Sequence, residues 1–260
     1  MALLDNKVGV VTGAGQGIGR AIAMSYAREG ARVVVADFNE TAGKETVALI
    51  QQAGGEATFA YGDVSKEDSV RAMIETVLTT YGRLDIACNS AALSRGSGRI
   101  HDYDREVFEE TLEMCLTNTW LCMKYEIPAM LETGGGAIVN ISSNASLKGQ
   151  PFNTAYAAAK GGVNILTRSS AAEYGSKGIR INAVSPGIVR TPGIEKYLEE
   201  QPQAAQNMLK RPVMKRLGEP EEIADAVTFL SSERASYILS LIHISEPTRP
   251  TRASRMPSSA

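Results

Sequence analysis

Short runs of β-branched and other apolar residues alternate with longer amphipathic stretches along most of this chain. The short runs have the length of strands, and the longer stretches have helical periodicity. Parallel strands need a crossover connection, usually a helix, whereas antiparallel strands can be joined by a tight turn. Strands that are apolar at nearly every position must also be covered on both faces. The alternation therefore predicts an α/β fold with a doubly wound parallel sheet and helices on both faces.

The expected elements are derived from this pattern. We expect strands at Lys7–Val11, Arg32–Ala36, Ala57–Tyr61, Leu84–Cys88, Ala137–Ile141 and Ile179–Val184. We expect helices at Gly19–Glu29, Glu40–Ala53, Asp68–Tyr81, Arg105–Leu131, Tyr156–Tyr174 and Pro220–Leu230. Prolines interrupt the polar stretch Arg190–Gly218, which is predicted to be a mobile lid, with an ordinary surface excursion as the alternative.

The composition favours one compact domain without affinity for nucleic acid or membranes. The 260 residues are 43% hydrophobic, and α/β folds of this length commonly close as a single domain. The net charge of -2 provides no global field to attract nucleic acid or anionic lipid. No secretion signal or membrane-span pattern occurs, and the three cysteines lack metal-ligand spacing. We therefore expect a soluble, cytoplasmic protein without a metal site.

A glycine-rich turn comes directly after the first expected strand and leads into the first expected helix. It reads T-G-x-x-x-G-I-G and includes Gly13, Gly17 and Gly19. Bare backbone lets a ligand approach, and the unpaired N–H groups and dipole of a helix N-terminus favour an anion. A glycine-rich turn alone can be an ordinary turn without a ligand, but its placement between strand and helix predicts a pyrophosphate site. Gln16 and Ile18 lie within the same turn.

Asp37 closes the second expected strand, about twenty residues beyond the glycine turn. A carboxylate at this point can accept both hydrogen bonds from an adenosine ribose diol, and it repels a 2′-phosphate. No Lys or Arg stands at position 16, 37 or 38 to compensate such a phosphate. The residue therefore predicts NAD rather than NADP as the cofactor, with an ordinary acidic turn residue as the alternative.

Tyr156 and Lys160 are spaced i to i+4, which places both side chains on one face of the expected helix. A phenol with an ordinary pKa near 10 is a poor base at neutral pH unless a fixed cation stabilises its phenolate. Lys160 is predicted to supply that charge. Ser143 precedes Tyr156 by thirteen residues, so a loop can return its hydroxyl to the same pocket, and Asn118 lies in the preceding helix.

These residues carry a family resemblance. The chain resembles a classical short-chain dehydrogenase/reductase over roughly residues 5 to 238. The matching motifs are Thr12-Gly13-x-x-x-Gly17-Ile18-Gly19, Asp63-Val64, Asn89, Asn118, Ile141-Ser142-Ser143, Tyr156-x-x-x-Lys160 and Pro186-Gly187-x-x-x-Thr191. The resemblance implies a single-domain Rossmann-like fold, usually in a homotetramer or homodimer. It also implies hydride transfer between NAD(H) and a secondary alcohol or ketone.

The resemblance also assigns roles to individual residues. Tyr156 is the expected acid/base, Lys160 holds the nicotinamide ribose and lowers the pKa of Tyr156, Ser143 binds the substrate oxygen, and Asn118 supports a proton-relay water. Ile188 and Thr191 are expected at the carboxamide, and Asp63 and Val64 at the adenine. The full expected cofactor set is Gly13, Gln16, Gly17, Ile18, Gly19, Asp37, Asp63, Val64, Asn89, Tyr156, Lys160, Pro186, Gly187, Ile188 and Thr191.

The chain departs from the family pattern in two places. Ala92 stands where the family usually has glycine, so we expect a modest effect on cofactor affinity. After Ile238 the family continues with a glycine-rich turn and a last strand, whereas residues 239–260 resemble translated sequencing-adapter sequence. We therefore expect a dehydrogenase domain over residues 1–238 and a non-family tail. Leu239–Ile244 could occupy the last strand's place through apolar character, and the distal tail is expected to be disordered.

A second functional interpretation comes from the altered C-terminus. A nucleotide-binding protein with little or no turnover would keep the glycine turn and Asp37 but would not need the Tyr156–Lys160 pair. Replacement of Tyr156 by phenylalanine separates the two hypotheses, since it should abolish turnover in an enzyme and leave the output of a sensor unchanged. An uncharged alicyclic or aromatic alcohol is favoured as the substrate, with sugars, acyl thioesters and steroids as alternatives.

Overall fold

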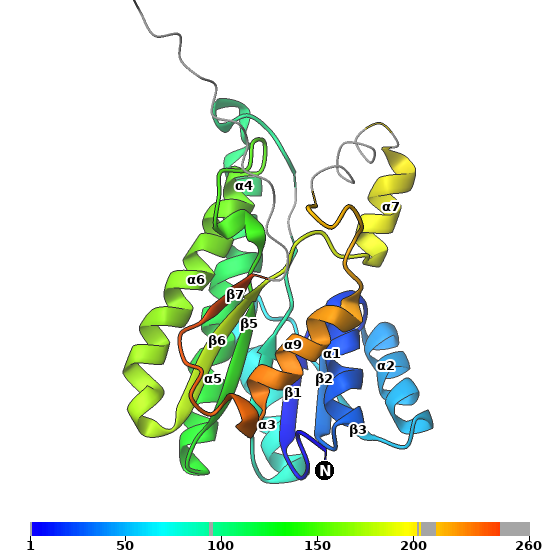
Figure 1. Cartoon of the computed structure of the whole chain (residues 1–260), viewed down its shortest axis with the longest axis vertical. Coiled ribbons are helices and arrows are strands. Elements are labelled where there is room, and N and C mark those ends of the chain that lie inside the picture. The colour runs from blue at the N-terminus through cyan, green and yellow to red at the C-terminus, as the bar shows by residue number, and fades with distance from the viewer. Residues whose placement is uncertain (1, 94–95, 202, 204–211, 245–260) are drawn as a thin grey trace, which may run out of the picture.

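The computed structural model describes residues 2–93, 96–201, 203 and 212–244. Within them, seven parallel strands form one sheet in the order β3-β2-β1-β4-β5-β6-β7, with helices on both faces (Figure 1). This confirms the predicted doubly wound, Rossmann-like architecture. The strand order reverses between β1 and β4, and in such sheets ligands bind beyond the carboxyl ends of the strands at this reversal.

The elements begin and end close to the predicted positions. The strands are β1 Val8–Thr12, β2 Arg32–Asp37, β3 Glu56–Tyr61, β4 Ile86–Asn89, β5 Gly136–Ile141, β6 Ile179–Ser185 and β7 Ile242–Ile244. The helices are α1 Gly17–Arg28, α2 Glu40–Gln52, α3 Glu67–Tyr81, α4 Arg105–Leu112, α5 Asn118–Glu132, α6 Thr154–Tyr174, α7 Pro192–Glu200 and α9 Pro220–Ser231. Helix α1 begins at Gly17, two residues earlier than predicted, so more of the glycine turn belongs to the helix.

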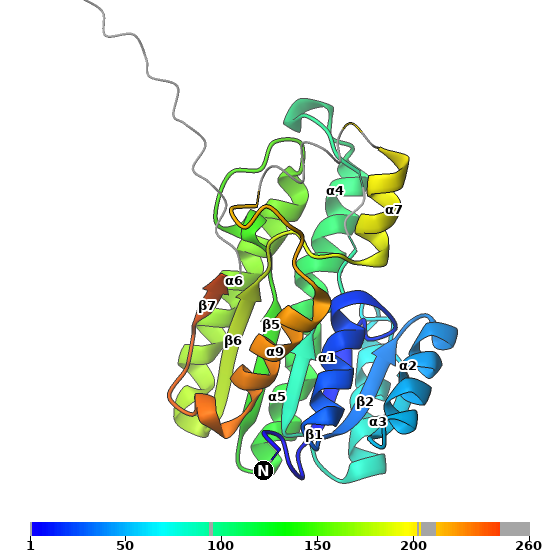
Figure 2. The ribbon, with the colours of Figure 1, turned by 45° about the vertical axis from the view of Figure 1, so that its right-hand side comes forward.

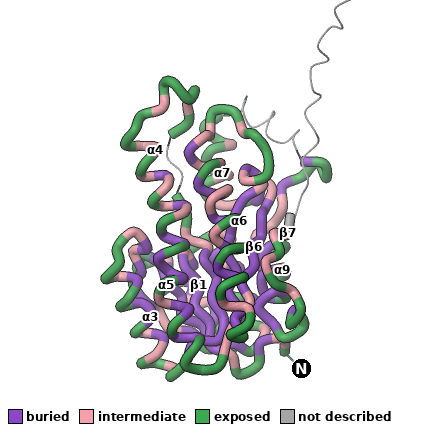
Figure 3. The backbone as a smooth tube through the Cα atoms, turned by 90° about the vertical axis from the view of Figure 1, so that its left-hand side faces the viewer, coloured by how far each residue is buried: buried purple, intermediate pink, exposed green. Residues whose placement is uncertain are grey.

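Each face of the sheet packs against its own set of helices. Side chains of successive strand residues point to opposite faces, so Val33 and Val35 lie in one hydrophobic cluster with α1, α2 and α9, and Val34 lies in the other with α3, α5 and α6. Buried residues accordingly concentrate along the strands (Figure 3). Both clusters require apolar residues at consecutive positions, which explains the continuous apolar runs in the sequence.

Helices α1 and α9 lie side by side although they are far apart in the sequence (Figure 2). Their contact includes two buried hydroxyl pairs, Ser25 Oγ with Thr228 Oγ1 at 2.9 Å and Tyr26 hydroxyl with Ser231 Oγ at 2.6 Å. These bonds satisfy polar groups that burial would otherwise leave unpaired. Helix α1, which follows the glycine turn, is therefore held in place by α9, from the C-terminal part of the chain.

The prediction of one continuous helix over Arg105–Leu131 is wrong in detail. Helix α4 ends at Leu112, a π-helical turn occupies Glu113–Thr117, and α5 begins at Asn118. A π-turn inserts an extra residue and rotates the next helical turns about the helix axis.

The predicted lid Arg190–Gly218 contains α7 at the carboxyl edge of the sheet, and its residues 202 and 204–211 lie outside the described residues (Figure 1).

The segment after Ile238 enters the sheet. Strand β7 pairs in parallel with β6, with Ile242 opposite Ala183. Asn182 of β6 fixes the approach, since its Nδ2 donates to Ile238 O at 2.9 Å and its Oδ1 accepts from Leu241 N at 3.0 Å. Residues 242–244 of the segment Leu239–Ile244 thus form a strand beside β6. That they take the place of the family's last strand stays a prediction. The expected disorder of the distal tail concerns residues 245–260, which lie outside the described residues.

Candidate active site

The glycine turn at the carboxyl end of β1 depends on glycine at three positions. Gly13 and Gly17 have φ of +65° and +55°, a region that side chains disfavour. A Cβ at Gly19 would lie 2.1 Å from Gly13 O, so any side chain there would collide with the turn. A Cβ at Gly17 would lie 3.3 Å from Thr191 Cγ2, which places Thr191 directly beside the turn. Two predicted cofactor segments, distant in sequence, therefore meet here.

The main chain of this turn is held from outside. Thr46 Oγ1 donates to Ala14 O at 2.9 Å, and Arg20 Nε donates to Gly15 O at 2.9 Å. In the described structure, exposed Gln16 makes no side-chain cap bond to α1, and the first turn of α1 contains no acidic residue. The N-terminus of α1 thus presents a preformed turn with unneutralised positive dipole, suited to an anionic group.

Asp37 lies against the glycine turn, at the end of β2. Its Oδ2 accepts from Gly15 N and its Oδ1 from Asn39 N, both at 2.8 Å, and the residue is 6% exposed. Both carboxylate oxygens are thus held by main-chain N–H donors. The structure therefore brings Asp37 to the turn, as the spacing predicted. Its selection of NAD over NADP stays a prediction.

The loops after β3 and β4 reach the same edge of the sheet. Asp63 Oδ1 accepts from Ser65 N at 3.1 Å, and the neighbouring Val64 is buried. Thr12 Oγ1, at the end of β1, accepts from Ser90 N at 3.1 Å and thereby ties the loop after β4 to the glycine turn. These loops are fixed by polar contacts within the protein.

Asn89 uses its side chain in a different way from the predicted cofactor contact. Its Nδ2 donates to Asn140 Oδ1 at 3.0 Å and to Glu126 Oε2 at 3.1 Å, within the buried layer between the sheet and α5. A contact with a cofactor at this position stays a prediction and would have to come from the main chain, since the amide is engaged in the core.

Ser143, Tyr156 and Lys160 come together at the carboxyl end of β5. The Tyr156 hydroxyl is hydrogen-bonded to the Ser143 hydroxyl, and Lys160 Nζ lies 5.9 Å from the centre of the Tyr156 ring. Lys160 Nζ donates to Ile141 O at 2.8 Å, and Ser142 Oγ donates to Lys160 O at 3.1 Å. The carboxyl end of β5 thus locks the helix that carries both catalytic candidates.

The electrostatics of this group differ from the prediction. Burial raises the pKa of Tyr156 to about 12, while the hydrogen bond from Ser143 acts in the opposite direction. Burial also lowers the pKa of Lys160. Lys160 is therefore not the dominant influence on the pKa of Tyr156 among the protein's own groups, contrary to the sequence prediction. The physical reason is that removal from water disfavours the phenolate more than these protein groups stabilise it.

The π-turn before α5 decides which residue faces the catalytic pair. Cys115 is fully buried, donates to Leu93 O at 3.4 Å, and acts electrostatically on both Tyr156 and Lys160. Sequence reasoning missed Cys115, because a helix assumed to be continuous gave no sign of the extra residue.

Asn118 makes bonds to the main chain. Its Nδ2 donates to Ala91 O and to Met114 O, both at 2.8 Å, and its Oδ1 accepts from Thr119 N at 2.6 Å. Met114 belongs to the π-turn, where carbonyls lack their usual helical partner. Asn118 therefore holds the π-turn and the loop after β4 in place, and its predicted support of a relay water stays a prediction.

The remaining expected cofactor residues come after β6. Pro186 is buried, and Gly187, Ile188 and Thr191 are partly exposed along the segment that leads into α7. Thr191 Oγ1 accepts from Ile194 N at 3.4 Å and caps that helix. Through its contact with Gly17, this segment borders the glycine turn.

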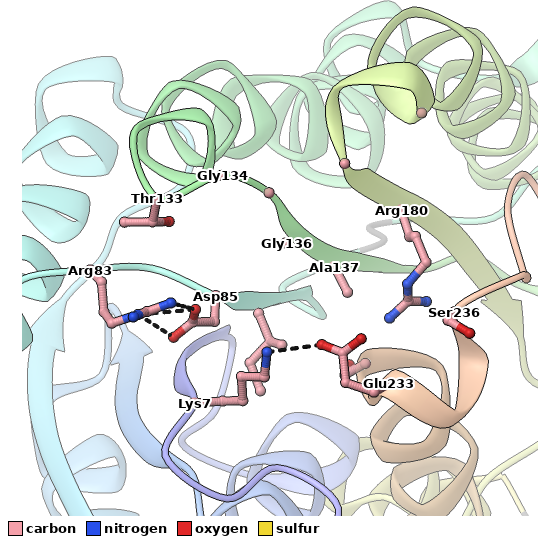
Figure 4. A pocket seen from close by; sticks show the side chains of 15 residues that line it. Lys7, Arg83, Asp85, Thr133, Gly134, Gly136, Ala137, Arg180, Glu233 and Ser236 are labelled. Carbon is pink, nitrogen blue, oxygen red and sulfur yellow. Dashed lines mark hydrogen bonds and ion pairs between the residues drawn. The ribbon is translucent and has the colours of Figure 1, made fainter.

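A cavity of about 410 Å³ lies at the opposite, amino-terminal edge of the sheet (Figure 4). Lys7 Nζ bonds Glu233 Oε1 at 2.9 Å, and Arg83 is paired with Asp85. Arg180 donates to Leu230 O at 2.7 Å. Lys7 and Arg83 are thus paired with carboxylates, Arg180 bonds main-chain carbonyl oxygen, and the cavity is remote from the catalytic group. Among the described residues, no cluster of His, Cys, Asp or Glu side chains could hold a metal ion. In the same part of the chain, no helix is long and apolar enough to span a membrane.

The fold, the glycine turn and the Ser143–Tyr156–Lys160 group together define a short-chain dehydrogenase/reductase. The chain belongs to this family: residues 13–244 match the family model described as "Enoyl-(Acyl carrier protein) reductase". It is an oxidoreductase whose relatives act on CH–OH groups.

Several similar proteins are named as dehydrogenases or reductases. The chain is 38% identical over 234 residues to a cyclohexanol dehydrogenase of Acinetobacter sp. (strain SE19), covering 90% of this chain and 91% of that protein. The crystal structure of levodione reductase superposes with a TM-score of 0.90 at 33% identity, over 94% of this chain and 97% of that one. A 7α-hydroxysteroid dehydrogenase complexed with NADH and 7-oxo glycochenodeoxycholic acid has a TM-score of 0.87 at 33% identity, with 93% of each chain covered.

Proposed function

We propose that the protein is an NAD-dependent dehydrogenase that oxidises a secondary alcohol on a ring to the ketone, or reduces the ketone in the reverse direction. The observation that most directly supports this proposal is the Tyr156–Ser143 hydrogen bond beside Lys160, at the same sheet edge as the glycine turn. The relatives named for cyclohexanol and for a hydroxysteroid support a cyclic substrate.

The residues present fit a dinucleotide. The α1 N-terminus and the positive φ at Gly13 and Gly17 suit a pyrophosphate that approaches bare backbone. The residues assigned to the cofactor are Gly13, Gln16, Gly17, Ile18 and Gly19 at the pyrophosphate, Asp37 at the adenosine ribose, Asp63 and Val64 at the adenine, Asn89 at the end of β4, Tyr156 and Lys160 at the nicotinamide ribose, and Pro186, Gly187, Ile188 and Thr191 at the carboxamide.

The preference for NAD over NADP rests on Asp37. Its carboxylate is fixed by main-chain N–H groups of Gly15 and Asn39, so it cannot turn away from a ligand at the turn without losing both bonds. A 2′-phosphate next to it would meet a like charge. The adjacent Phe38 and the exposed Gln16 carry no compensating positive charge.

The chain's own groups account for the proton transfer. When bound, a nicotinamide supplies the acceptor for the hydride that leaves the carbinol carbon. In the direction of oxidation, the phenolate form of Tyr156 accepts the hydroxyl proton and becomes the phenol as the carbon–oxygen double bond forms, and Ser143 holds the oxygen by a hydrogen bond. Lys160, fixed by Ile141 O, holds a positive charge next to the phenol and so opposes the effect of burial on the phenolate.

We also propose that the protein forms a homo-oligomer and is cytoplasmic. Trp120 on α5 and Ile165 on α6 have exposed fractions of 46% and 58%, and both are large apolar side chains. Burial of such side chains against a second copy would be favourable. Size-exclusion chromatography with light scattering measures the state directly, and a monomer at micromolar concentration would contradict the proposal.

Two experiments test the function. The first is a thermal-shift titration with NADH and, in parallel, NADPH, because a ligand that binds the folded state raises the apparent stability with the logarithm of its concentration. We expect a shift with NADH at concentrations where NADPH gives none. The second measures NADH formation during oxidation of cyclohexanol in the wild type and in Tyr156→Phe. We expect turnover to fall by at least about 10²-fold in the variant.

Controls separate catalysis from binding and folding. Tyr156→Phe should keep the thermal shift with NADH, whereas Tyr174→Phe, at the far end of the same helix α6, should keep both binding and turnover. Binding of NADH without turnover of any of a panel of cyclic and acyclic alcohols would favour the nucleotide-binding protein over the enzyme. An equal shift with NADPH would overturn the role of Asp37.

A further inference from the structure

A carboxyl group is buried in the core beneath the proposed active site. Glu126 of α5 has no exposed surface, and its Oε2 accepts from Asn89 Nδ2 at 3.1 Å. Within the described part of the chain, Glu126 Oε1 has no hydrogen-bond partner, and the same holds for Asn89 Oδ1. The two unpartnered atoms thus belong to the two side chains that the first bond already joins.

The protonation state of Glu126 decides whether these atoms can be satisfied. An ionised carboxylate only accepts hydrogen bonds, so Oε1 would carry buried charge without a donor, and Asn89 Oδ1, also an acceptor, would lack a donor as well. A neutral carboxyl has one O–H donor. Given to Asn89 Oδ1, this donor would satisfy both atoms and form a closed acid–amide pair of two hydrogen bonds. Burial raises the pKa of Glu126 to about 7, which is the direction that this arrangement requires.

Within the described ranges, no cation is found among the groups that act on Glu126. The titratable groups electrostatically coupled to it are Cys88 of β4, Cys122 of α5 and Tyr26 of α1. Burial raises the pKa of each of them, so all three are neutral near pH 7. A buried carboxylate among such groups is costly, whereas a neutral carboxyl with both oxygens bonded is not.

The acid–amide pair continues into the elements that carry the catalytic residues. Asn89 Nδ2 also donates to Asn140 Oδ1 of β5 at 3.0 Å, and Asn140 Nδ2 donates to Thr167 Oγ1 of α6 at 3.0 Å. The series therefore joins α5, β4, β5 and α6 across the core. Ser143 comes three residues after Asn140, and Lys160 lies two turns before Thr167 on the same helix.

We propose that Glu126 is a positioning residue that works in the protonated form, donating from Oε1 to Asn89 Oδ1 and so fixing the carboxyl ends of β4 and β5 against α6. Ionisation would remove this donor and loosen the spacing of the group formed by Ser143, Tyr156 and Lys160. For its effect on turnover, the inference rests on the proposed function. For its effect on protonation and stability, it does not.

Glu126→Gln is the decisive variant, because glutamine has the same shape and carries a permanent N–H donor in place of the carboxyl O–H. Glu132→Gln, on the exposed end of α5, is the matched control. We expect the ratio of kcat of Glu126→Gln to kcat of the wild type to be near one at pH 6. By pH 9 we expect that ratio to rise at least about threefold. The ratio cancels the pH dependence of the chemical step, and Glu132→Gln should give a flat ratio.

Infrared difference spectroscopy gives a readout that needs no turnover. The wild type at pH 5.5 should show the carbonyl band of a protonated, hydrogen-bonded carboxyl, which Glu126→Gln lacks and which fades as the pH rises to 9. Absence of this band at pH 5.5, or a kcat ratio that stays flat to pH 9, would overturn the inference. If no alcohol is oxidised, the proposed function fails while the band still decides the state of Glu126. If the variant does not fold, the wild-type band, assigned by ¹³C-labelled glutamate, decides alone.

Discussion

Replacement of Ser240 by glycine is expected to stabilise the protein. Ser240 has φ of +61°, in the segment that joins Ile238 to β7. Its N–H donates to Ile181 O at 3.0 Å, and the next residue, Leu241, bonds to β6 through both Asn182 Oδ1 and Ala183 N. These bonds on both sides of the left-handed residue prevent the backbone from relaxing into an ordinary conformation.

The magnitude is the difference of two opposing contributions. An L-residue in the left-handed region costs about 1–2 kcal/mol, and glycine removes this cost. Glycine in turn loses about 0.5–1 kcal/mol more conformational entropy on folding. We therefore expect a net gain of about 0.5–1 kcal/mol in the free energy of unfolding. For a chain of this size that is an increase of about 1–4 °C in Tm.

The assay is urea unfolding combined with a thermal scan, and Ser236→Gly is the control. Ser236 lies four residues earlier with φ of -57°, where glycine gives no relief of strain, so that variant should lose about 0.5–1 kcal/mol. If Ser240→Gly destabilises the protein as much as Ser236→Gly does, Ser240 does not adopt the left-handed conformation. The reasoning about the path into β7 would then be refuted.

Three further predictions concern the core and the site. The unfolding free energy of Glu126→Gln relative to the wild type should grow by about 2–3 kcal/mol between pH 5 and 8, because the native pKa of about 7 for Glu126 exceeds the ordinary value of 4.5 and the wild type loses stability as the pH rises through this window. Urea unfolding at each pH measures this difference, and a difference that does not change with pH contradicts the prediction. Thr12→Val should cost about 1–3 kcal/mol and weaken NADH binding, because Ser90 N and Ala91 N lose their acceptor; isothermal calorimetry and unfolding together check this. All three cysteines are free and buried, so a thiol reagent should label less than one equivalent in the native protein and three after denaturation; rapid native labelling would contradict the burial.

Much of the fold could be predicted from local pattern. The apolar runs around Val33–Val35 predicted strands covered on both faces, because neighbouring side chains point in opposite directions. The position of Asp37 beside the glycine turn was predictable as well, since the carboxyl ends of β1 and β2 lie at one edge of a parallel sheet. Such inferences need only the period of the pattern and the crossover rule.

Other features depend on contacts that sequence spacing does not encode. The π-turn at Glu113–Thr117 has no sequence signal, yet it decides that Cys115 faces Tyr156 and Lys160 while Asn118 bonds to Ala91 O. The pKa of Tyr156 was predicted to be lowered by Lys160, but burial raises it, and the extent of burial is a property of the packed core.

Backbone propensity and residue spacing act locally, so the order of strands and helices, the glycine turn and the set of groups available for chemistry can be read along the chain. Which polar groups are removed from water together depends on how the elements pack. Asn89 was expected at a cofactor, yet its amide is joined to Glu126 and Asn140 in the core. The free energy of a buried polar group depends on neighbours from other elements, and those neighbours are fixed only when the sheet and helices pack.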